Sequence, residues 1–516
     1  MSENSQTTFD VAIIGGGING CGIARDAQGR GLKTLLLEKH DLANATSSSS
    51  TKLIHGGLRY LEQYEFKLVR EALNERELLM KQAPHIIWPL KFVLPHSPEQ
   101  RPAWMVRIGL FLYDFLGKRD VLPGSKSMDL TRELEGKPLQ NWIKKGFSYS
   151  DLWAQDTRIS ILSAMEAKAK GATVLTRTEV TSAIRSEDKQ SWVVTTLNTK
   201  GETNEFRAKA LFNASGPWAG DVDARVLGAN KPGVIRMVKG SHIVVNKLFE
   251  GDQAYILQND DERVIFAIPY EHNYTLIGTT DVDYEGDPKQ ASCSDEEKSY
   301  LCRAVNRYFN TQVTPEHIVW TYSGVRPLLE TDGEDAQQLS RGYTFGVVAA
   351  EESAGAEAGQ KIAPRISVYG GKITAFRELA DDAMSKLGQH MDVGTAWTKS
   401  GTLPGGNFEQ VWGTLNFDEA LTSFQKQFSF LPDALARRYM RNYGTLAVDF
   451  LKDAQSLADM GQHLGDDIYE KELAYLAAFE FAQTGEDVYW RRSRLGLHLK
   501  PETMVAIDNW METHAA

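Results

Sequence analysis

Cysteine is scarce in this 516-residue sequence, which contains three: Cys21, Cys293 and Cys302. Their spacing matches no metal-binding pattern, and an odd number leaves at least one thiol unpaired. Such usage is typical of a reducing compartment. We therefore expect neither a disulfide framework nor a metal site.

Long apolar runs and an excess of basic residues are also missing. No stretch reaches the roughly 20 apolar residues of a membrane-spanning helix. The first residues, MSENSQTT, are polar and do not resemble a signal peptide, so secretion is not expected. A net charge of -11 argues against nucleic-acid binding, because a polyanion needs a basic face. Any anionic ligand must be met by a local group of cations.

The sequence does contain a nucleotide-binding pattern near its start. The apolar run 9–14 leads into GGGINGCG, in which Gly15, Gly17 and Gly20 match G-x-G-x-x-G between a strand and a helix. Gly15 allows the tight turn, Gly17 lets a pyrophosphate approach the backbone, and Gly20 permits close packing of helix on strand. We expect the start of this helix to face phosphate groups.

A second expected strand, 34–37, ends at Glu38. This is about the position of a carboxylate that binds a ribose 2′-hydroxyl, which disfavours a 2′-phosphorylated cofactor. The pattern leaves NAD and FAD as alternatives. Beyond it, TSSSSTKLIHGGLRYL (46–61) combines hydroxyls, paired glycines, Lys52 and Arg59, a composition suited to phosphates and a bound anion.

The segment 103–117, AWMVRIGLFLYDFLG, is predicted to be a helix that is apolar except for one stripe containing Arg107, Asp114 and Lys118. Two interpretations remain open. It is either a core helix with one wet edge or an interfacial helix whose aromatic side chains enter lipid. The neighbouring segment 84–95 would widen such an apolar surface.

The middle of the chain alternates between helix and strand signals. Asp156 is expected to cap a helix that ends near Lys170, and 174–180 is expected to be a strand. From 234 to 283 short strands predict an antiparallel sheet that walls a substrate site, with His242 in one of them.

A second glycine-rich helix start contains Gly370, Gly371, Lys372 and Thr374, which suggests a long cofactor held at two points. From about residue 397 the apolar spacing becomes helical and predicts a small helical domain. In that domain the cluster 490–492 is expected to form surface salt bridges.

These segments resemble the FAD-dependent glycerol-3-phosphate dehydrogenases, and most of all the bacterial aerobic, membrane-associated enzymes. The resemblance rests on GGGINGCGIA, TSSSSTKLIHGGLRYLEQYEFKLVREAL, KGSHIVV, IGTTDVDYEGDPK, WTYSGVRPL and YGGKITAFRELA, and it continues to the final WRR. It implies an α/β fold with a Rossmann-like FAD-binding domain of the D-amino-acid-oxidase-like type, an interleaved antiparallel substrate sheet and a C-terminal α-helical domain. The implied FAD part is 1–85, 150–230 and 362–396, the substrate part is 231–361, and the helical domain is 397–516.

The resemblance also implies the site residues. Those expected to hold FAD are Gly15, Gly17, Asn19, Gly20, Glu38, Thr46, Ser47, Ser48, Lys52, Leu53, His55, Gly56, Val180, Ser215, Gly216, Gly371, Lys372 and Thr374. Those expected to bind the substrate are Arg59, Tyr60, Thr280, Arg326, Arg341 and Lys372, with His242 and Arg326 as catalytic residues. His242 is the expected base because an imidazole accepts a proton near neutral pH, and His55 is the competing candidate.

The implied reaction is oxidation of sn-glycerol 3-phosphate to dihydroxyacetone phosphate, with electrons passed to membrane quinone. The expected location is the cytoplasmic face of the inner membrane, as a peripheral or monotopic protein, and a homodimer is among the expected assemblies. The alternatives are an oxidase that uses oxygen, an amine or amino-acid oxidase of the same fold, and a non-catalytic flavin-binding protein.

Overall fold

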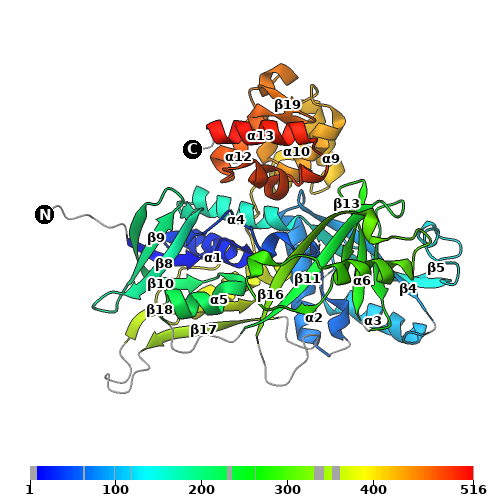
Figure 1. Ribbon diagram of the computed structural model, residues 1–516, viewed down its shortest axis with the longest axis horizontal. Coiled ribbons are helices and arrows are strands. Elements are labelled where there is room, and N and C mark those ends of the chain that lie inside the picture. Colours follow the sequence, from blue (N-terminus) through cyan, green and yellow to red (C-terminus); the bar gives the residue numbers. More distant parts are fainter. Residues whose placement is uncertain are drawn as a thin grey trace.

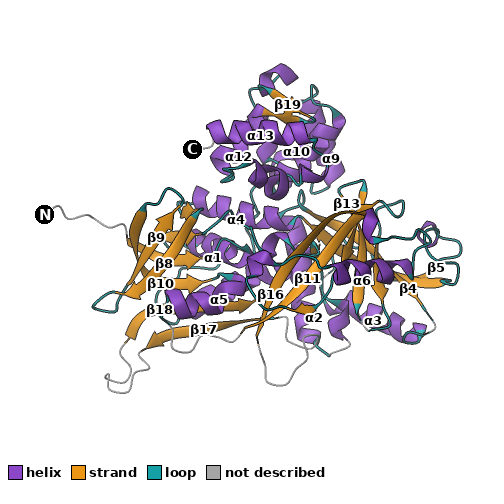
Figure 2. Cartoon of the chain, viewed as in Figure 1, coloured by secondary structure: helices purple, strands orange, loops and turns teal. Residues whose placement is uncertain are grey.

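The computed structural model describes residues 8–61, 64–97, 99–117, 119–228, 235–261, 263–329, 342–350 and 361–514. Two large sheets lie side by side, and a helical domain formed by the last part of the chain sits against them, at the top of Figure 1. Figure 2 shows the division between the strand-rich body and this helical domain.

The central strands of the first sheet are parallel. In order, its strands are β17 (Tyr343–Ala350), β18 (Lys361–Gly370), β10 (Thr203–Asn213), β1 (Thr8–Ile14), β2 (Thr34–Leu37) and β7 (Thr173–Leu175), and β9 (Trp192–Asn198) links β10 to β8 (Thr178–Arg185). Helices α1 (Ile18–Gly29), α4 (Asp156–Ala169) and α7 (Phe376–Leu387) contact its strands. The parallel order places the carboxyl ends of β1, β2 and β10 at one edge, where ligands of such sheets bind.

Strand β1 is buried on both faces, as expected for the centre of a covered parallel sheet. Val11 and Ile13 enter one core with residues of α1 and α7. Ala12 and Ile14 enter the core on the opposite face, which includes Trp192. Alternation of side chains along the strand therefore ties both layers to one backbone.

The second sheet is mostly antiparallel. In order, its strands are β15 (Val282–Asp283), β11 (Ile235–Asn246), β14 (Tyr274–Gly278), β13 (Val264–Tyr270), β12 (Ala254–Gln258), β4 (Ile87–His96), β6 (Lys145–Ala154) and β3 (Leu53–Ile54); β16 (Ile318–Leu329) pairs with β11, and β5 (Lys126–Asp129) with β6. One face packs on α6 (Asp295–Asn306), and the other core takes in side chains of α2 (Phe66–Gln82) and α3 (Ala103–Leu116). The expected substrate part, 231–361, does not coincide with this second sheet. Strand β17 lies within 231–361 but pairs in the first sheet, whereas β4, β5 and β6 belong to the second sheet and precede residue 231.

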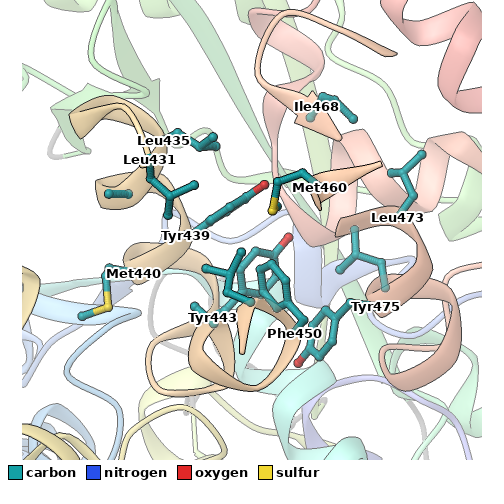
Figure 3. Packing of buried hydrophobic residues seen from close by; sticks show 14 of the residues in the cluster. Leu431, Leu435, Tyr439, Met440, Tyr443, Phe450, Met460, Ile468, Leu473 and Tyr475 are labelled. Atoms are coloured by element: carbon teal, nitrogen blue, oxygen red, sulfur yellow. The ribbon is translucent and has the colours of Figure 1, made fainter. Parts of the chain in front are cut away.

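The C-terminal helical domain has its own core. Its elements are α8 (Phe408–Trp412), α9 (Phe417–Gln427), α10 (Asp433–Tyr443), α11 (Leu446–Leu451), the strands β19 (His463–Gly465) and β20 (Ile468–Tyr469), α12 (Glu470–Phe479), the π-helical turn η10 (Asp487–Arg492) and α13 (Pro501–His514). Figure 3 shows Tyr439, Tyr443, Phe450 and Tyr475 gathered at its centre. The predicted fold class, with its helical C-terminal domain, is confirmed.

Three local predictions are wrong. Asp156 is the first residue of α4 and Gln155 is the N-cap. The expected strand 174–180 is interrupted, because Arg177 adopts a left-handed backbone conformation with φ of 52° between β7 and β8. Residues 84–95 add little exposed apolar surface, since most of the segment forms β4, in which Phe92 and Leu94 are buried and Pro89 is exposed.

Candidate active site

The glycine-rich turn lies between β1 and α1, at the carboxyl edge of the first sheet. Gly15 has φ of +109°, and a Cβ placed there would lie 2.6 Å from the carbonyl oxygen of Ala214. A Cβ on Gly20 would lie 1.9 Å from the oxygen of Gly15. Both positions therefore require glycine, and the main chain is left bare where helix α1 begins.

Glu38 follows β2 and faces the same turn. Its carboxylate accepts hydrogen bonds from the main-chain N–H of Gly16 (2.6 Å) and of His40 (2.7 Å). Burial raises the pKa of this carboxyl, while the two N–H donors act in the opposite direction. The carboxylate is thus fixed beside the glycine-rich turn, and its contact with a ribose hydroxyl stays a prediction.

Residues 46–56, which we call the cofactor loop, lie against both sheets. Ser47 Oγ accepts a hydrogen bond from the N–H of Ile18 at the start of α1 (2.9 Å). Thr46 Oγ1 donates to the carbonyl of Val325 in β16 (2.6 Å). Ser48 Oγ donates to the carbonyl of Ala45. The hydroxyls therefore tie the loop to the dinucleotide turn on one side and to the substrate sheet on the other.

Lys52 is buried at the centre of this loop. Its ammonium donates to the carbonyl of Ser48 (3.0 Å) and pairs with the buried carboxylate of Asp156 at the start of α4 (2.9 Å). Burial, and then the positive charge of Arg494, lowers the pKa of Lys52 to about 8. Its ammonium thus supports the loop from inside, with a proton that is held less firmly than in water.

The far end of the cofactor loop is held by α3. Tyr113 Oη accepts a hydrogen bond from the N–H of Gly56 (2.8 Å) and donates to the carboxylate of Asp151 (2.8 Å). Arg76 pairs with the same carboxylate (2.8 Å). All three side chains are buried, so α3 is connected directly to the loop backbone.

The second glycine-rich start, at the end of β18, meets the first one. Gly371 has φ of +104°, and a Cβ there would lie 2.9 Å from the amide nitrogen of Asn19 in α1. Thr374 Oγ1 accepts a hydrogen bond from the N–H of His55 (3.4 Å). The ammonium of Lys372 lies 4.0 Å from the centre of the Tyr60 ring. The structure therefore brings together both glycine-rich turns and both ends of the cofactor loop.

His242 lies in β11, between Gly278 of β14 and Tyr322 of β16. Its Nε2 lies 2.9 Å from Thr51 Oγ1, and its ring stacks on that of Tyr322 with centroids 4.7 Å apart. Its Nδ1 is buried and has no hydrogen-bond partner among the described residues. Burial, and then the charges of Lys52 and Arg326, lowers the pKa of His242 well below its usual value. The imidazole is thus neutral at neutral pH, with one nitrogen free to accept a proton.

Arg326 and Thr280 lie in the strands around His242. The Arg326 guanidinium pairs with Asp281 and donates to Thr279 Oγ1 (3.0 Å), and it is partly exposed. Thr280 is buried, accepts from the N–H of Ser241 (2.9 Å) and donates to the carboxylate of Glu297 (2.7 Å). Its hydroxyl is therefore engaged within the protein, and a substrate contact of Thr280 stays a prediction.

Other predicted residues are spread around the same region or lie outside the described part. Leu53 is in β3, Val180 in β8, and Ser215 and Gly216 follow β10, where Ser215 Oγ donates to Asn213 (2.6 Å). Arg341 and the side chain of Arg59 lie outside the described residues.

Sequence reasoning missed Thr51, Asp156 and Tyr113, and it misplaced the cluster 490–492. Arg491 and Arg492 form buried ion pairs with Asp41 rather than surface salt bridges, so that prediction is wrong. The partners are 450 and 451 residues apart in sequence, and no local pattern signals such a contact.

These residues fit a dinucleotide with two phosphates. The bare turn at Gly15 and Gly20 accepts a pyrophosphate, and Glu38 suits a ribose hydroxyl. The amide oxygen of Asn19, beside Gly371, is buried without a hydrogen-bond partner among the described residues. A ligand that spans both turns would pass this atom.

Comparisons with known proteins agree with this geometry. The family described as FAD dependent oxidoreductase matches residues 10–355, and the C-terminal domain of alpha-glycerophosphate oxidase matches residues 396–515. The chain is 47% identical to D-erythritol 1-phosphate dehydrogenase of Brucella abortus, covering 98% of both chains. It is 45% identical to the aerobic glycerol-3-phosphate dehydrogenase of Escherichia coli, covering 98% of this chain and 97% of that one.

A solved structure is similar over the whole chain. The glycerol-3-phosphate dehydrogenase of Bacillus halodurans, in complex with FAD, superposes with a TM-score of 0.78 at 26% identity, covering 100% of this chain and 92% of that one. The similarity includes both the sheets and the helical domain.

Proposed function

This chain belongs to the FAD dependent oxidoreductase family, and we propose that it oxidises sn-glycerol 3-phosphate to dihydroxyacetone phosphate with FAD as its cofactor. The observation that carries the proposal is the buried, neutral His242 beside Arg326 at the cofactor loop. A base next to a cation suits a phosphorylated alcohol. Relatives of nearly equal length, at 45% identity, are named for this reaction.

The substrate phosphate is held by cations. Arg326 offers a planar pair of N–H donors for phosphate oxygens, and Lys372 adds a point charge above the Tyr60 ring. Because Asp281 pairs with Arg326, the guanidinium is oriented before the substrate arrives. Binding the phosphate in this way fixes the alcohol carbon relative to His242.

The alcohol must lose a hydride from carbon 2 and a proton from its hydroxyl. Bound FAD supplies the two-electron oxidant. His242 Nδ1 accepts the hydroxyl proton in the tautomer whose Nε2–H donates to Thr51 Oγ1, because Nδ1 then carries the lone pair. The residues expected to hold FAD are those of the two glycine-rich turns, Glu38 and the cofactor loop.

We further propose that the electrons pass to membrane quinone and that α3 docks the protein on the cytoplasmic face of the membrane. Six large apolar side chains of α3 are exposed: Trp104, Met105, Ile108, Phe111, Leu112 and Phe115. Its polar residues face the protein instead. Arg107 donates to Ser125 Oγ (2.7 Å), and Ser125 Oγ donates to the carboxylate of Asp114 (2.6 Å). This outward apolar face supports the interfacial interpretation over the core helix. In the described part of the chain, no helix is both long and apolar enough to cross a bilayer.

A second substrate is favoured by one comparison. The relative at 47% identity acts, by its name, on D-erythritol 1-phosphate. This compound is also a polyol phosphate and would use the same phosphate-binding cations and base. It differs in the length of its carbon chain.

The test is anaerobic reduction of the purified holoprotein. We expect glycerol 3-phosphate to bleach the visible flavin absorbance, with faster reoxidation by a soluble quinone than by air. Bleaching by erythritol 1-phosphate at a much lower concentration would assign the second substrate. Bleaching by neither compound would refute the proposed function, and faster reoxidation by air would indicate an oxidase.

A further inference from the structure

The segment 490–494 of the C-terminal domain carries three arginines that are all buried against the FAD-binding part. Arg491, Arg492 and Arg494 are 7%, 1% and 7% exposed. Burying three cations within four residues is costly unless each is paired. Their partners lie outside the C-terminal domain as well as within it, and these partners indicate what the segment does.

The first partner is Asp41, in the loop that follows Glu38. Arg491 Nε lies 2.5 Å from Asp41 Oδ2, and Arg492 contacts both carboxylate oxygens at 2.5 and 2.8 Å. Arg491 also pairs with Asp487 (2.6 Å) within its own turn. The ribose end of the cofactor site is therefore tied to the C-terminal domain at the residue that follows His40, whose N–H donates to Glu38.

The second partner is Asp156, which is shared with the cofactor loop. Arg494 pairs with Asp156 Oδ1. The other oxygen, Oδ2, accepts from Ser50 Oγ (2.7 Å) and from the Lys52 ammonium (2.9 Å). One buried carboxylate thus joins the C-terminal segment to the middle of the cofactor loop.

The third connection is a row of aromatic rings that ends at the base. Trp490 stacks on Trp320 with centroids 4.8 Å apart and an interplanar angle of 9°. Trp320 contacts Tyr322 at 5.1 Å, and Tyr322 stacks on His242 at 4.7 Å. Tyr322 Oη also donates to the carbonyl of Ser50 (2.9 Å). The row reaches both His242 and the cofactor loop.

A cavity of about 310 Å³ separates parts of these elements, lined among others by Ser49, Lys52, Trp490 and Arg494. The segment and the loop are therefore not joined by continuous packing. The ion pairs and the ring row carry the connection across this gap.

We infer that residues 490–494 act as a clamp from the C-terminal domain that positions the cofactor loop, the ribose-binding loop and His242. The clamp residues act through Asp41, Asp156 and the ring of Trp320, so they are positioning residues. The part of the inference that concerns His242 rests on the proposed function; the part that concerns cofactor retention does not.

The test compares Arg494→Gln with Arg438→Gln in the full-length holoprotein. Arg438 is a partly buried arginine of the C-terminal domain, but it pairs with Glu472 inside that domain (2.6 Å). We expect both substitutions to lower the melting temperature. Only Arg494→Gln should speed FAD release, by about tenfold or more, because it loses a charged hydrogen bond. The release rate is measured by the rise of FAD fluorescence after dilution.

Two further variants keep the inference testable if Arg494→Gln does not fold. Arg494→Lys retains the charge and should restore most of the slow release. Trp490→Leu should lower the rate of flavin reduction at saturating substrate with little change in KM. The inference is overturned if FAD leaves Arg494→Gln and Arg438→Gln at equal rates, or, where Arg494→Gln does not fold, if Trp490→Leu reduces its flavin as fast as the unmodified protein. Failure of glycerol 3-phosphate to bleach a protein whose FAD release responds as expected would sink the proposed function and leave the cofactor clamp standing.

Discussion

His242 is held from two sides, by Thr51 at Nε2 and by the Tyr322 ring, and within the described part of the chain its Nδ1 has no hydrogen-bond partner. Replacing it by glutamine retains a polar side chain but removes the base. We expect His242→Gln to slow flavin reduction by about 10²- to 10⁴-fold, the range typical of a general base, in stopped-flow absorbance. FAD content should be unchanged. Nearly full reduction rates would rule out His242 and direct attention to His55.

The low pKa of His242 also sets the pH dependence. Because the neutral form is the base and the pKa lies well below its usual value, a fall in pH from 8 to 6.5 protonates little of it. We expect the rate of flavin reduction at saturating substrate to stay nearly constant over this range. A tenfold loss of rate with a midpoint near pH 7 would show that His242 is charged there.

Arg236, on the neighbouring strand, provides a matched control for Arg326. Arg236 of β11 pairs with Asp283 (2.7 Å), much as Arg326 of β16 pairs with Asp281. We expect Arg326→Ala to raise KM for glycerol 3-phosphate by at least about tenfold, the effect of losing a charged hydrogen bond, while FAD content is retained. Arg236→Ala should leave KM unchanged. Equal effects would mean that Arg326 only supports the sheet.

Some residues of the site can be predicted from a local sequence motif, and others cannot. The positions of Gly15, Gly20 and Glu38 could be predicted because they depend on local backbone geometry and on one strand-to-strand step. Thr51 and Asp156 could not, because their partners are 191 and 104 residues away and only the folded chain brings them together.

The outer face of helix α3 is apolar and its charged side chains turn toward the protein, the reverse of a helix that covers a core. Phe111 and Phe115 are 52% and 66% exposed, whereas Tyr113 is buried and bonded to Gly56. The sequence predicted the helix and its polar stripe but left open which side faces water. The contacts of Arg107 and Asp114 with Ser125, in a loop that no periodicity reveals, answer this.

The exposed face of α3 can be tested by charge. We expect the double substitution Phe111→Asp and Phe115→Asp to abolish most co-sedimentation with phospholipid vesicles, because burying carboxylates in lipid is unfavourable. Reduction of the flavin by substrate should persist. Phe479→Asp, at an equally exposed phenylalanine of the C-terminal domain (59%), is the control. If both proteins stay on vesicles, another surface binds them.

The inner face of α3 has a separate role. Tyr113→Phe keeps the ring but leaves the Gly56 N–H without its acceptor and Asp151 without one donor. We expect a shift of the flavin absorbance maxima and weaker FAD retention, since the cofactor loop loses its tether. Tyr255→Phe removes a comparable hydroxyl, bonded to Glu135, from a distant core. A spectrum that responds equally to both substitutions would contradict this role.

Buried histidines make the stability of the whole molecule depend on pH. The His85 side chain is fully buried between the large body and the C-terminal domain, near Phe408, and neither ring nitrogen has a hydrogen-bond partner among the described residues. Burial, and then the charges of Arg158 and Arg441, lowers its pKa well below 6.5. Below pH 6.5 the unfolded chain therefore takes up a proton that the folded protein does not, and the free energy of unfolding falls.

This predicts a pH-dependent melting temperature. Each such histidine removes up to about 1.4 kcal/mol per pH unit below 6.5. We expect His85→Leu to lose less stability than the unmodified protein between pH 7 and 5.5, in thermal unfolding followed by fluorescence. His390→Gln, at an exposed histidine, should show the unmodified slope. An unchanged slope for His85→Leu would mean that other groups dominate the acid response.

The overall architecture was predictable because strand, glycine turn and helix recur in order along the chain. How the C-terminal domain contacts the body was not, because that interface depends on buried charges such as Asp41 and Arg492 rather than on periodicity. The expectation of surface salt bridges failed for this reason. Charged residues are normally solvated, and their burial is visible only when the partner is known.

The distance in sequence between these partners has a consequence for biosynthesis. Asp41 leaves the ribosome 450 residues before Arg491. At roughly 5–20 residues per second, its carboxylate waits about 20 to 90 seconds for the guanidinium that neutralises it. Asp41, beside the FAD site, thus lacks the guanidinium groups of Arg491 and Arg492 until η10 has been synthesised, and in that interval a chaperone or free FAD would have its largest protective effect.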